Sequence, residues 1–237
     1  MQGRSKQMLE AARKVGHHHG DAMLQQLGFG FAHLLHSIPE LSLVRFGHWD
    51  EVLKLSEPHG STFHSGMWHF ARGMAFNGQG KAAEAAKELA ELRKSAAAPE
   101  LEESKVFDVN SLAGLARIGA KVLEGEIAAQ KRDYEAAVAS LRNAVELEDA
   151  LLYSEPPDWP NPPRHNLGAV LLEAGLYKEA ETVYREDLRR HRNNGWSLYG
   201  LAASLEKQGR SREAAEAKAA FNKAWSQADV QIAASRF

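Results

Sequence analysis

Histidine is the residue type in this sequence with the clearest capacity for chemistry. Nine of the 11 histidines lie between residues 17 and 69. A neutral imidazole is the most common metal ligand in proteins, and it titrates near neutral pH. His33 and His36 are three positions apart, which places them on one face of a helix. This spacing makes the N-terminal third of the chain a candidate metal-binding region.

A metal site would need ligands from outside that pair. The consecutive histidines before it could supply a third ligand, and a nearby carboxylate could supply a fourth. Such a set suits zinc or nickel with an open coordination position. The candidate ligands are His17, His18, His19, His33 and His36, with Asp21 or Glu40 as the carboxylate.

The same histidines also fit an ordinary place on the surface and between the helices of a divergent repeat. The His-Glu-x-x-His spacing of metalloproteases is absent from the sequence. Gly28 and Gly30 would loosen a helix that presents the pair. Adventitious binding by the triple histidine is therefore favoured over a physiological site. A histidine-dependent metal- or small-molecule-binding protein, including an enzyme, is the alternative function.

Other catalytic signatures are missing. The sequence has no cysteine, which excludes disulfide bonds, thiolate zinc sites and cysteine nucleophiles. The Gly-x-Ser-x-Gly motif of a nucleophile elbow is also absent. Residues 78–81 read Gly-Gln-Gly-Lys, but they lack the spacing and the Ser or Thr of a phosphate loop. We interpret them as a turn between two helices.

A proline-rich segment carries the best candidate for a recognition site. Residues 156–163 contain five prolines, which fix φ and leave little freedom to lose on binding. The segment also holds an aromatic residue beside a charge, which is typical of an interface anchor. In the alternative interpretation, Trp159 folds back over the core and the segment only connects two irregular repeats. The candidate binding residues are Trp68, His69, Asp158, Trp159, Arg164 and His165.

The charge balance and the hydropathy pattern exclude two classes of partner. The chain has 29 Lys and Arg residues against 31 Asp and Glu residues, a formal net charge of −2 with neutral histidines. A general nucleic-acid-binding protein would carry a basic excess. No stretch approaches the roughly 18 consecutive apolar residues of a membrane span, and the first residues lack the apolar core of a signal peptide. We expect a cytoplasmic protein that binds neither nucleic acid nor membrane.

The elements that must position these residues are helices. Prolines are absent from residues 1–38, 100–155 and 164–237, so these stretches lack the residue that breaks helix interiors. Apolar residues recur within them at steps of three and four, which is the helical period. Clean strand alternation does not occur. The sequence therefore predicts an all-α fold.

A repeat of 34 residues organises the last third of the chain. Two blocks read as helix, tight glycine turn and helix, and matching positions lie 34 residues apart: Leu167, Leu171, Gly175 and Ala180, then Leu201, Leu205, Gly209 and Ala214. The 34-residue spacing and the small residues of these blocks resemble the tetratricopeptide repeat (TPR). Each TPR unit has two helices, A and B, and a small residue lies where they cross. Gly168 and Ala202 occupy that crossing here.

The resemblance to TPR proteins implies a right-handed α-solenoid with about four helix pairs, a partial N-terminal unit and a C-terminal helix. The predicted helix-B anchors are Val52, Ala85, Ala137, Ala180 and Ala214. Extra length falls in loop-like stretches at 96–104 and 154–163. Solenoids of this kind bind proteins or peptides in a concave groove, so the resemblance implies a protein- or peptide-binding scaffold.

We expect one domain over residues 1–237. Its predicted parts are an irregular histidine-rich start (1–37), divergent repeats (38–153), the proline-rich loop (154–163), and regular repeats with a C-terminal helix (164–237). Segments such as Glu155-Pro156-Pro157-Asp158-Trp159 also resemble a group of bacterial TPR proteins, over about residues 40–235. That second resemblance implies no activity.

The N-terminus predicts a dimer. Residues 3–15 resemble the second helix of a repeat whose first helix is missing. Its apolar positions, Met8, Leu9 and Ala12, need cover, and another copy of the chain is the simplest source. The histidine-rich residues 17–36 would lie near that contact. We therefore expect a homodimer that weakens as the pH falls from about 7.5 to about 5.5, because the histidines become charged.

Overall fold

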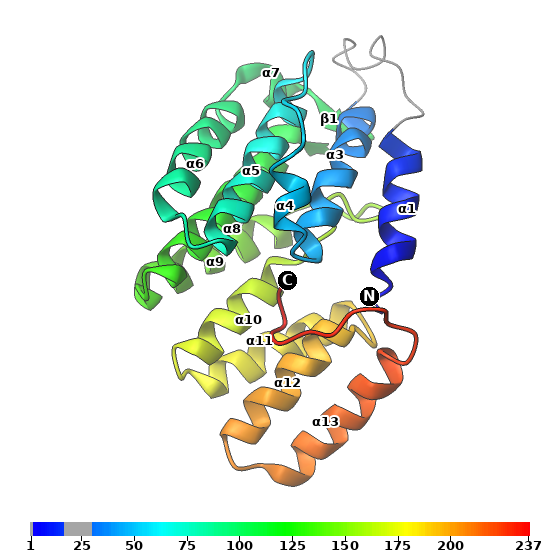
Figure 1. Ribbon diagram of the computed structural model, residues 1–237, viewed down its shortest axis with the longest axis vertical. Coiled ribbons are helices and arrows are strands. Elements are labelled where there is room, and N and C mark those ends of the chain that lie inside the picture. Colours follow the sequence, from blue (N-terminus) through cyan, green and yellow to red (C-terminus); the bar gives the residue numbers. More distant parts are fainter. Residues whose placement is uncertain (1, 17–29) are drawn as a thin grey trace. The chain divides into compact units, whose positions relative to one another are not determined.

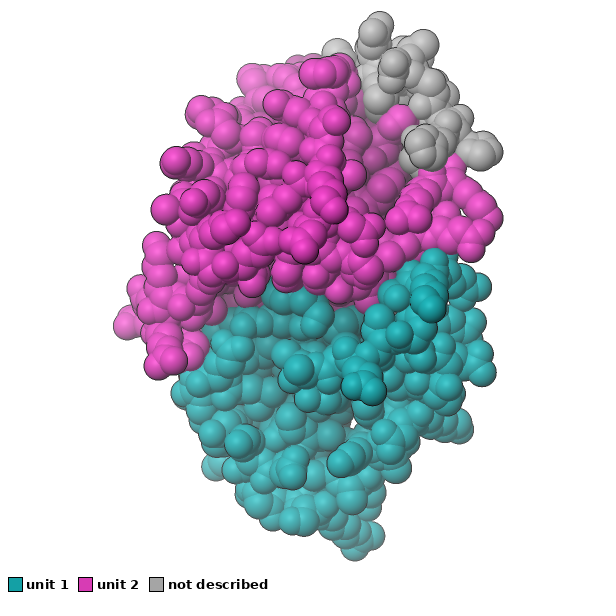
Figure 2. All heavy atoms as spheres, viewed as in Figure 1, with its two compact units in different colours: residues 1–7, 162–237 teal, residues 8–161 magenta. Residues whose placement is uncertain are grey.

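The computed structural model describes residues 2–16 and 30–237. Within these residues the fold is helical, and strands are limited to one short antiparallel hairpin. The prediction of an all-α fold is confirmed. Two compact units are formed: unit 1 consists of Met1–Gln7 and Pro162–Phe237, and unit 2 of Met8–Asn161 (Figure 2). No helix in the described part of the chain is long and apolar enough to cross a membrane.

Unit 2 consists mainly of helices in which chain neighbours pack against each other. The first turn of α1 (Ser5–Gly16) belongs to unit 1 and the rest of that helix to unit 2. The other elements of unit 2 are α3 (Gly30–Arg45), α4 (Trp49–Val52), α5 (Thr62–Gly78), α6 (Ala82–Ala96), α7 (Pro99–Glu103), β1 (Lys105–Val106), β2 (Asn110–Ser111), α8 (Leu112–Gln130) and α9 (Tyr134–Asp149).

Unit 1 contains the two regular blocks of the sequence repeat. Its helices are α10 (Pro163–Glu173), α11 (Tyr177–Arg190), α12 (Gly195–Lys207) and α13 (Ser211–Ala224). Each of them packs against the next (Figure 1). Gly175 and Gly209 link the helices of the two pairs with φ of +77° and +73°, a conformation that only glycine adopts without strain. The tight glycine turns predicted from the repeat are therefore present.

The predicted helix-B anchors and the crossing residue Gly168 are buried, as close approach between helix backbones requires, whereas the second predicted crossing residue, Ala202, is half-buried. The predicted anchors Val52, Ala85, Ala137, Ala180 and Ala214 each expose 9% or less of their surface. Burial of this kind removes apolar area from water and stabilises the helix pairs. These positions therefore mark contacts between helices in both units.

Three local features differ from the expectations. Pro39 lies inside α3 and does not end a helix, so the predicted boundary at residue 37 falls within that helix. The stretch 96–104, expected to be a loop, contains the short helix α7. The strands β1 and β2 follow it directly and escaped prediction because each has only two residues, too few to show alternation.

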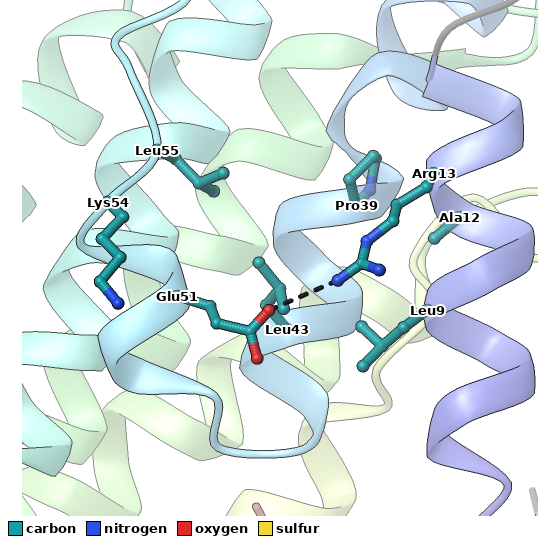
Figure 3. Close-up of a pocket in the computed structure, with 8 residues that line it drawn as sticks. All are labelled: Leu9, Ala12, Arg13, Pro39, Leu43, Glu51, Lys54 and Leu55. Atoms are coloured by element: carbon teal, nitrogen blue, oxygen red, sulfur yellow. Dashed lines mark hydrogen bonds and ion pairs between the residues drawn. The ribbon is translucent and has the colours of Figure 1, made fainter.

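Helix α1 is present where the sequence predicted it, and its apolar side is covered within the chain. Leu9 exposes 9% and Ala12 exposes 3% of its surface. Together with Pro39 and Leu43 of α3, these residues line a shared cavity in unit 2 (Figure 3). An exposed apolar stripe on α1 was the argument for a dimer. Leu9 and Ala12 are buried and Met8 is half-buried, so the dimer stays a prediction without that argument.

Candidate functional site

The ring of one tyrosine in unit 1 lies between two helices, in the space left by a glycine on each of them. Tyr184 lies on α11, and its ring packs against Gly168 of α10 and Gly200 of α12. A Cβ atom at either glycine would overlap the ring. Tyr184 itself is fully buried. The two glycines therefore make room for the ring and determine where its hydroxyl group lies.

The Tyr184 hydroxyl meets a segment from the end of the chain. We call residues 228–237 the C-terminal segment; it has no regular secondary structure and runs back across unit 1 (Figure 1, red). The Tyr184 Oη and Ser235 Oγ atoms are 2.7 Å apart. Ser235 Oγ donates to the His165 carbonyl oxygen at 3.0 Å. A serine has one hydroxyl hydrogen, so Tyr184 is the donor in its bond to Ser235.

Ser235 is held in a closed environment. It exposes 1% of its surface. Burial raises the pKa of the Tyr184 hydroxyl well above its ordinary value, which keeps this group protonated and able to donate. Tyr184 and the His165 carbonyl thus form a pair of one donor and one acceptor. A serine hydroxyl satisfies both at once.

Two further contacts hold the segment on either side of Ser235. The Tyr199 hydroxyl on α12 donates to the Ala233 carbonyl at 3.0 Å. Arg236 Nη2 donates to Glu173 Oε1 on α10 at 2.6 Å, and the Arg236 side chain is 14% exposed. We call the surface made by Tyr184, the His165 carbonyl, Tyr199 and Glu173 the segment face. In this face the Tyr199 hydroxyl binds a backbone carbonyl, Tyr184 and the His165 carbonyl enclose a hydroxyl side chain, and Glu173 binds a basic side chain.

The start of the C-terminal segment is tied to unit 1 by other contacts. Trp225 Nε1 donates to the Val230 carbonyl at 2.9 Å. Asp229 accepts hydrogen bonds from the Ser5 backbone at 2.6 Å and the Lys6 backbone at 3.0 Å, and so caps the first turn of α1. The segment is therefore fixed at its start and docked on the segment face near its end.

A buried polar network lies in the same unit and joins α10, α11 and α12. Asp187 Oδ2 accepts from Ser197 Oγ at 2.5 Å and from Asn194 Nδ2 at 2.7 Å. Asp187 Oδ1 lies 2.9 Å from His191 Nδ1, and Oδ2 lies 3.3 Å from His165 Nε2. Burial alone would raise the pKa of Asp187, but bonds from His165, His191 and Ser197 together hold it well below its ordinary range.

This network is structural in character. Ser197 donates to the carboxylate of Asp187 and not to an imidazole, so the serine is not activated as a nucleophile would be. Asp187, Ser197 and His165 are all fully buried, which keeps a substrate away from them. The network therefore fixes the helices that carry Tyr184 and Tyr199.

The candidate residues in the proline-rich loop point into unit 2. Trp159 exposes 3% of its surface and packs edge-on against Phe70, with ring centroids 5.7 Å apart. Asp158 also exposes 3%, and it accepts from Asn110 Nδ2 at 2.7 Å. Asn161 donates to the Leu41 carbonyl at 3.1 Å. In this geometry the loop is folded onto the core, as in the alternative interpretation.

The other candidate binding residues fall into two groups. Arg164 and His165 are buried in α10, and only the carbonyl of His165 contributes to the segment face. Trp68 is 8% exposed and donates to the Leu55 carbonyl. His69 Nδ1 lies 2.6 Å from Glu88 Oε2, and the His69 ring packs edge-on against Trp68 with ring centroids 5.0 Å apart. Trp68, His69, Asp158 and Trp159 thus belong to unit 2, and Arg164 and His165 belong to unit 1.

Three of the histidines in unit 2 form a cluster without metal-site geometry. His33 Nδ1 lies 2.7 Å from Ser61 Oγ, and His64 Nε2 lies 2.8 Å from Glu40 Oε1. The rings of His36 and His64 are 6.0 Å apart. Among the residues that the structure describes, no group of three or more suitable side chains is arranged to hold a metal ion. The candidate ligands at positions 17–19, and Asp21, lie outside the described residues.

Unit 2 contains a small cavity of about 270 Å³ beside α1 (Figure 3). Its lining is Leu9, Ala12, Arg13, Pro39, Leu43, Glu51, Lys54 and Leu55. Arg13 reaches from α1 to Glu51 of α4, 3.5 Å away. This volume is below the range of about 300–1,000 Å³ typical of small-molecule sites. The segment face is therefore the stronger candidate site.

Comparisons with protein-family models, with curated proteins and with solved structures found no match for this chain. Of the segment face, sequence reasoning named only His165, and it missed Tyr184, Tyr199 and Glu173. Tyr184 fits the apolar period of its helix, so its hydroxyl gave no separate signal. A usable signal would have been the glycine on each flanking helix, Gly168 and Gly200, because such pairs make room for a large side chain.

Proposed function

We propose that this protein is a scaffold that binds a protein or peptide partner, and that its helix pairs form a TPR-like right-handed solenoid. The observation that carries the proposal is the docking of the C-terminal segment, with Ser235 buried between the Tyr184 hydroxyl and the His165 carbonyl. A segment without regular secondary structure is in effect a peptide. The segment face thus has the chemistry that holds one.

The arrangement of the helices supports the TPR-like interpretation. Within unit 2 the helices of the pairs α5–α6 and α8–α9 pack against each other, and within unit 1 those of α10–α11 and α12–α13 do. Glycines lie where helices approach closely: Gly125 of α8 faces Leu141 of α9, and Gly168 of α10 faces Tyr184 of α11. Close approach at small residues is the property from which the resemblance was inferred.

The positions of the polar groups suit a peptide better than a rigid small molecule. Tyr199 contacts a backbone carbonyl, which every peptide possesses. Glu173 presents a carboxylate whose side chain is 41% exposed, so it is accessible to a basic side chain. Tyr199 is itself held in place by its ring contact with Phe221 of α13, with ring centroids 5.5 Å apart. These groups are pre-organised, which lowers the entropy lost on binding.

The test is to free the segment face and ask whether it binds peptides. A variant lacking residues 231–237 keeps the contacts of Asp229 and Val230 and exposes Tyr184, Tyr199 and Glu173. We expect it to select peptides from a displayed random library, with affinities measured by fluorescence anisotropy. The substitution Tyr199→Ala should weaken every selected peptide, whereas Glu216→Ala on the exposed side of α13 should not. A complete lack of peptides binding tighter than about 1 mM would contradict the proposal.

A further inference from the structure

We propose that the C-terminal segment is an internal competitor of the partner, and that the partner peptide carries a serine followed directly by a basic residue. This inference rests on the proposed function and specifies it. The observation behind it is the match between two neighbouring side chains of the segment, Ser235 and Arg236, and two separate groups of the segment face.

The serine preference follows from the pocket that Tyr184 and the His165 carbonyl make. Tyr184 donates and the carbonyl accepts, so the side chain between them must do both in a small space. Alanine would leave the buried Tyr184 hydroxyl without its acceptor, which is costly in a closed site. Serine has the smallest side chain that satisfies both groups.

The basic preference follows from Glu173. Glu173 Oε1 accepts a charge-assisted hydrogen bond from Arg236 Nη2 at 2.6 Å. An acidic residue at the same position would be repelled. Because Arg236 follows Ser235 directly, the two preferences apply to adjacent residues of the peptide.

A third contact fixes the direction in which the peptide chain runs across the segment face. It involves a backbone group, so it does not depend on the sequence of the peptide. Tyr199 donates to the carbonyl of Ala233, two residues before Ser235. The recognition pattern is therefore a free backbone carbonyl, one intervening residue, a serine and a basic residue. Removing the Tyr199 hydroxyl should weaken all peptides by the same factor.

Competition follows from the short tether. The segment is fixed at Val230 by Trp225 and needs only five more residues to reach the Ser235 position. A tether this short gives the segment an effective concentration of about millimolar order at the face. An external peptide with the same contacts must therefore displace the segment before it can bind.

The experiment uses a fluorescent peptide with the sequence of residues 230–237 as the probe. We expect the variant lacking residues 231–237 to bind this probe about tenfold or more tightly than the full chain does. The full chain with Ser235→Ala should bind the probe more tightly than wild type, because its own segment is held less well. Circular dichroism of each variant checks that the helices are intact.

The sequence preference is tested with altered probes on the shortened variant. A probe with Ser235→Ala should bind about tenfold more weakly, which corresponds to the loss of one or two hydrogen bonds. A probe with Arg236→Glu should also bind more weakly, and it should recover on a shortened variant that carries Glu173→Arg. The swap is a matched control, since general damage to the face would weaken both probes.

Each outcome has a separate meaning. If the full chain and the shortened variant bind the probe with equal affinity, the proposal that the C-terminal segment competes with the partner is overturned. Binding of library peptides without a serine and basic pattern would overturn the stated preference and leave the proposed function standing. If the probe instead splits a dimer detected by light scattering, the occupant is a second copy of this chain, and the separate partner is rejected. Failure of all peptides to bind contradicts the proposed function itself.

Discussion

The ring of Tyr184 occupies the space that a side chain on Gly200 would need. Replacing Gly200 with alanine should therefore push Tyr184 out of place and destabilise unit 1 by about 2 kcal/mol, as overpacking commonly does. The effect should disappear in a Tyr184→Ala background, because the ring that clashes is gone. Urea unfolding of the two single variants and the double variant measures this coupling. If the losses in the free energy of unfolding of the two single variants add up in the double variant, the ring and a Cβ at position 200 do not compete for the same space.

A control for this experiment is available in unit 2. Gly114 lies in the first turn of α8, where a Cβ would meet only the Ser111 Oγ atom, at 3.3 Å. Gly114→Ala should change the free energy of unfolding by less than about 1 kcal/mol. A cost as large as that of Gly200→Ala would mean that alanine in a helix of this protein is harmful for a general reason.

Asp187→Asn should destabilise unit 1 by about 3 kcal/mol, because a buried carboxylate with several donors loses its charge. Burial opposes the charge of Asp187, yet bonds from His165, His191 and Ser197 lower its pKa overall. A lowered pKa gives stability that is complete above the ordinary value of about 3.9 and is lost as the pH falls below it. The variant should therefore lack part of the acid-dependent loss seen in wild type.

Hydrogen exchange of the amides in α10–α12 follows this loss between about pH 5 and about pH 2.5, the range in which this carboxylate takes up its proton in the unfolded chain. Glu216→Gln on α13 is the matched control, since Glu216 is exposed and pairs with exposed Arg212. An Asp187→Asn variant with the same acid dependence as wild type would show that this carboxylate does not contribute.

Acid should also weaken unit 2 through His33. Burial first, and then the charges of His36 and His64, lower the pKa of His33. The unfolded chain therefore takes up a proton at this position more readily, and stability is lost as the pH falls through about 6.5. In His33→Asn, the amide can still bond to Ser61, and unit 2 should lose less stability between about pH 7.5 and about pH 5.5, by up to about 1 kcal/mol.

Protection of amides in α3 and α5 against hydrogen exchange measures that difference. The contact between His64 and Glu40 faces the same cluster and is unchanged in the variant. His59→Asn at an exposed position provides the control. If both variants respond to pH as wild type does, His33 is not the group responsible.

Trp159→Ala should destabilise unit 2 by about 3–5 kcal/mol, as truncation of a buried aromatic residue does. The ring packs against Phe70 and lies beside Gly119, and its Nε1 donates to the Asn161 carbonyl at 2.8 Å. Binding of the peptide probe to the variant lacking residues 231–237 should be unchanged when Trp159→Ala is added. A loss of binding without a loss of stability would instead identify Trp159 as an anchor for the partner.

The sequence was sufficient to predict the helices and much of their packing. Steps of 34 residues between small and apolar positions located the turns at Gly175 and Gly209 and the buried positions of α10–α13. Pro39 was misleading, because a proline usually ends a helix but here lies within α3. The pattern around it carried no information about the contacts that keep the helix intact.

The candidate site was much less predictable than the fold. Tyr184 and Ser235 are 51 positions apart, and no local pattern links a tyrosine on one helix to a serine beyond the last helix. The predicted anchor Trp159 has the right composition for an interface, but composition does not distinguish a side chain that faces a partner from one that packs inward. Only the arrangement in space made that distinction.

The cap that Asp229 places on the first turn of α1 has a consequence for how the chain is made. Ser5 and Asp229 are separated by 224 positions, so unit 1 cannot be completed until Asp229 has left the ribosome. Unit 2, in contrast, is continuous from Met8 to Asn161 and can fold while synthesis continues. Folding should therefore begin in the middle of the chain, and the two distant stretches of unit 1 should join last.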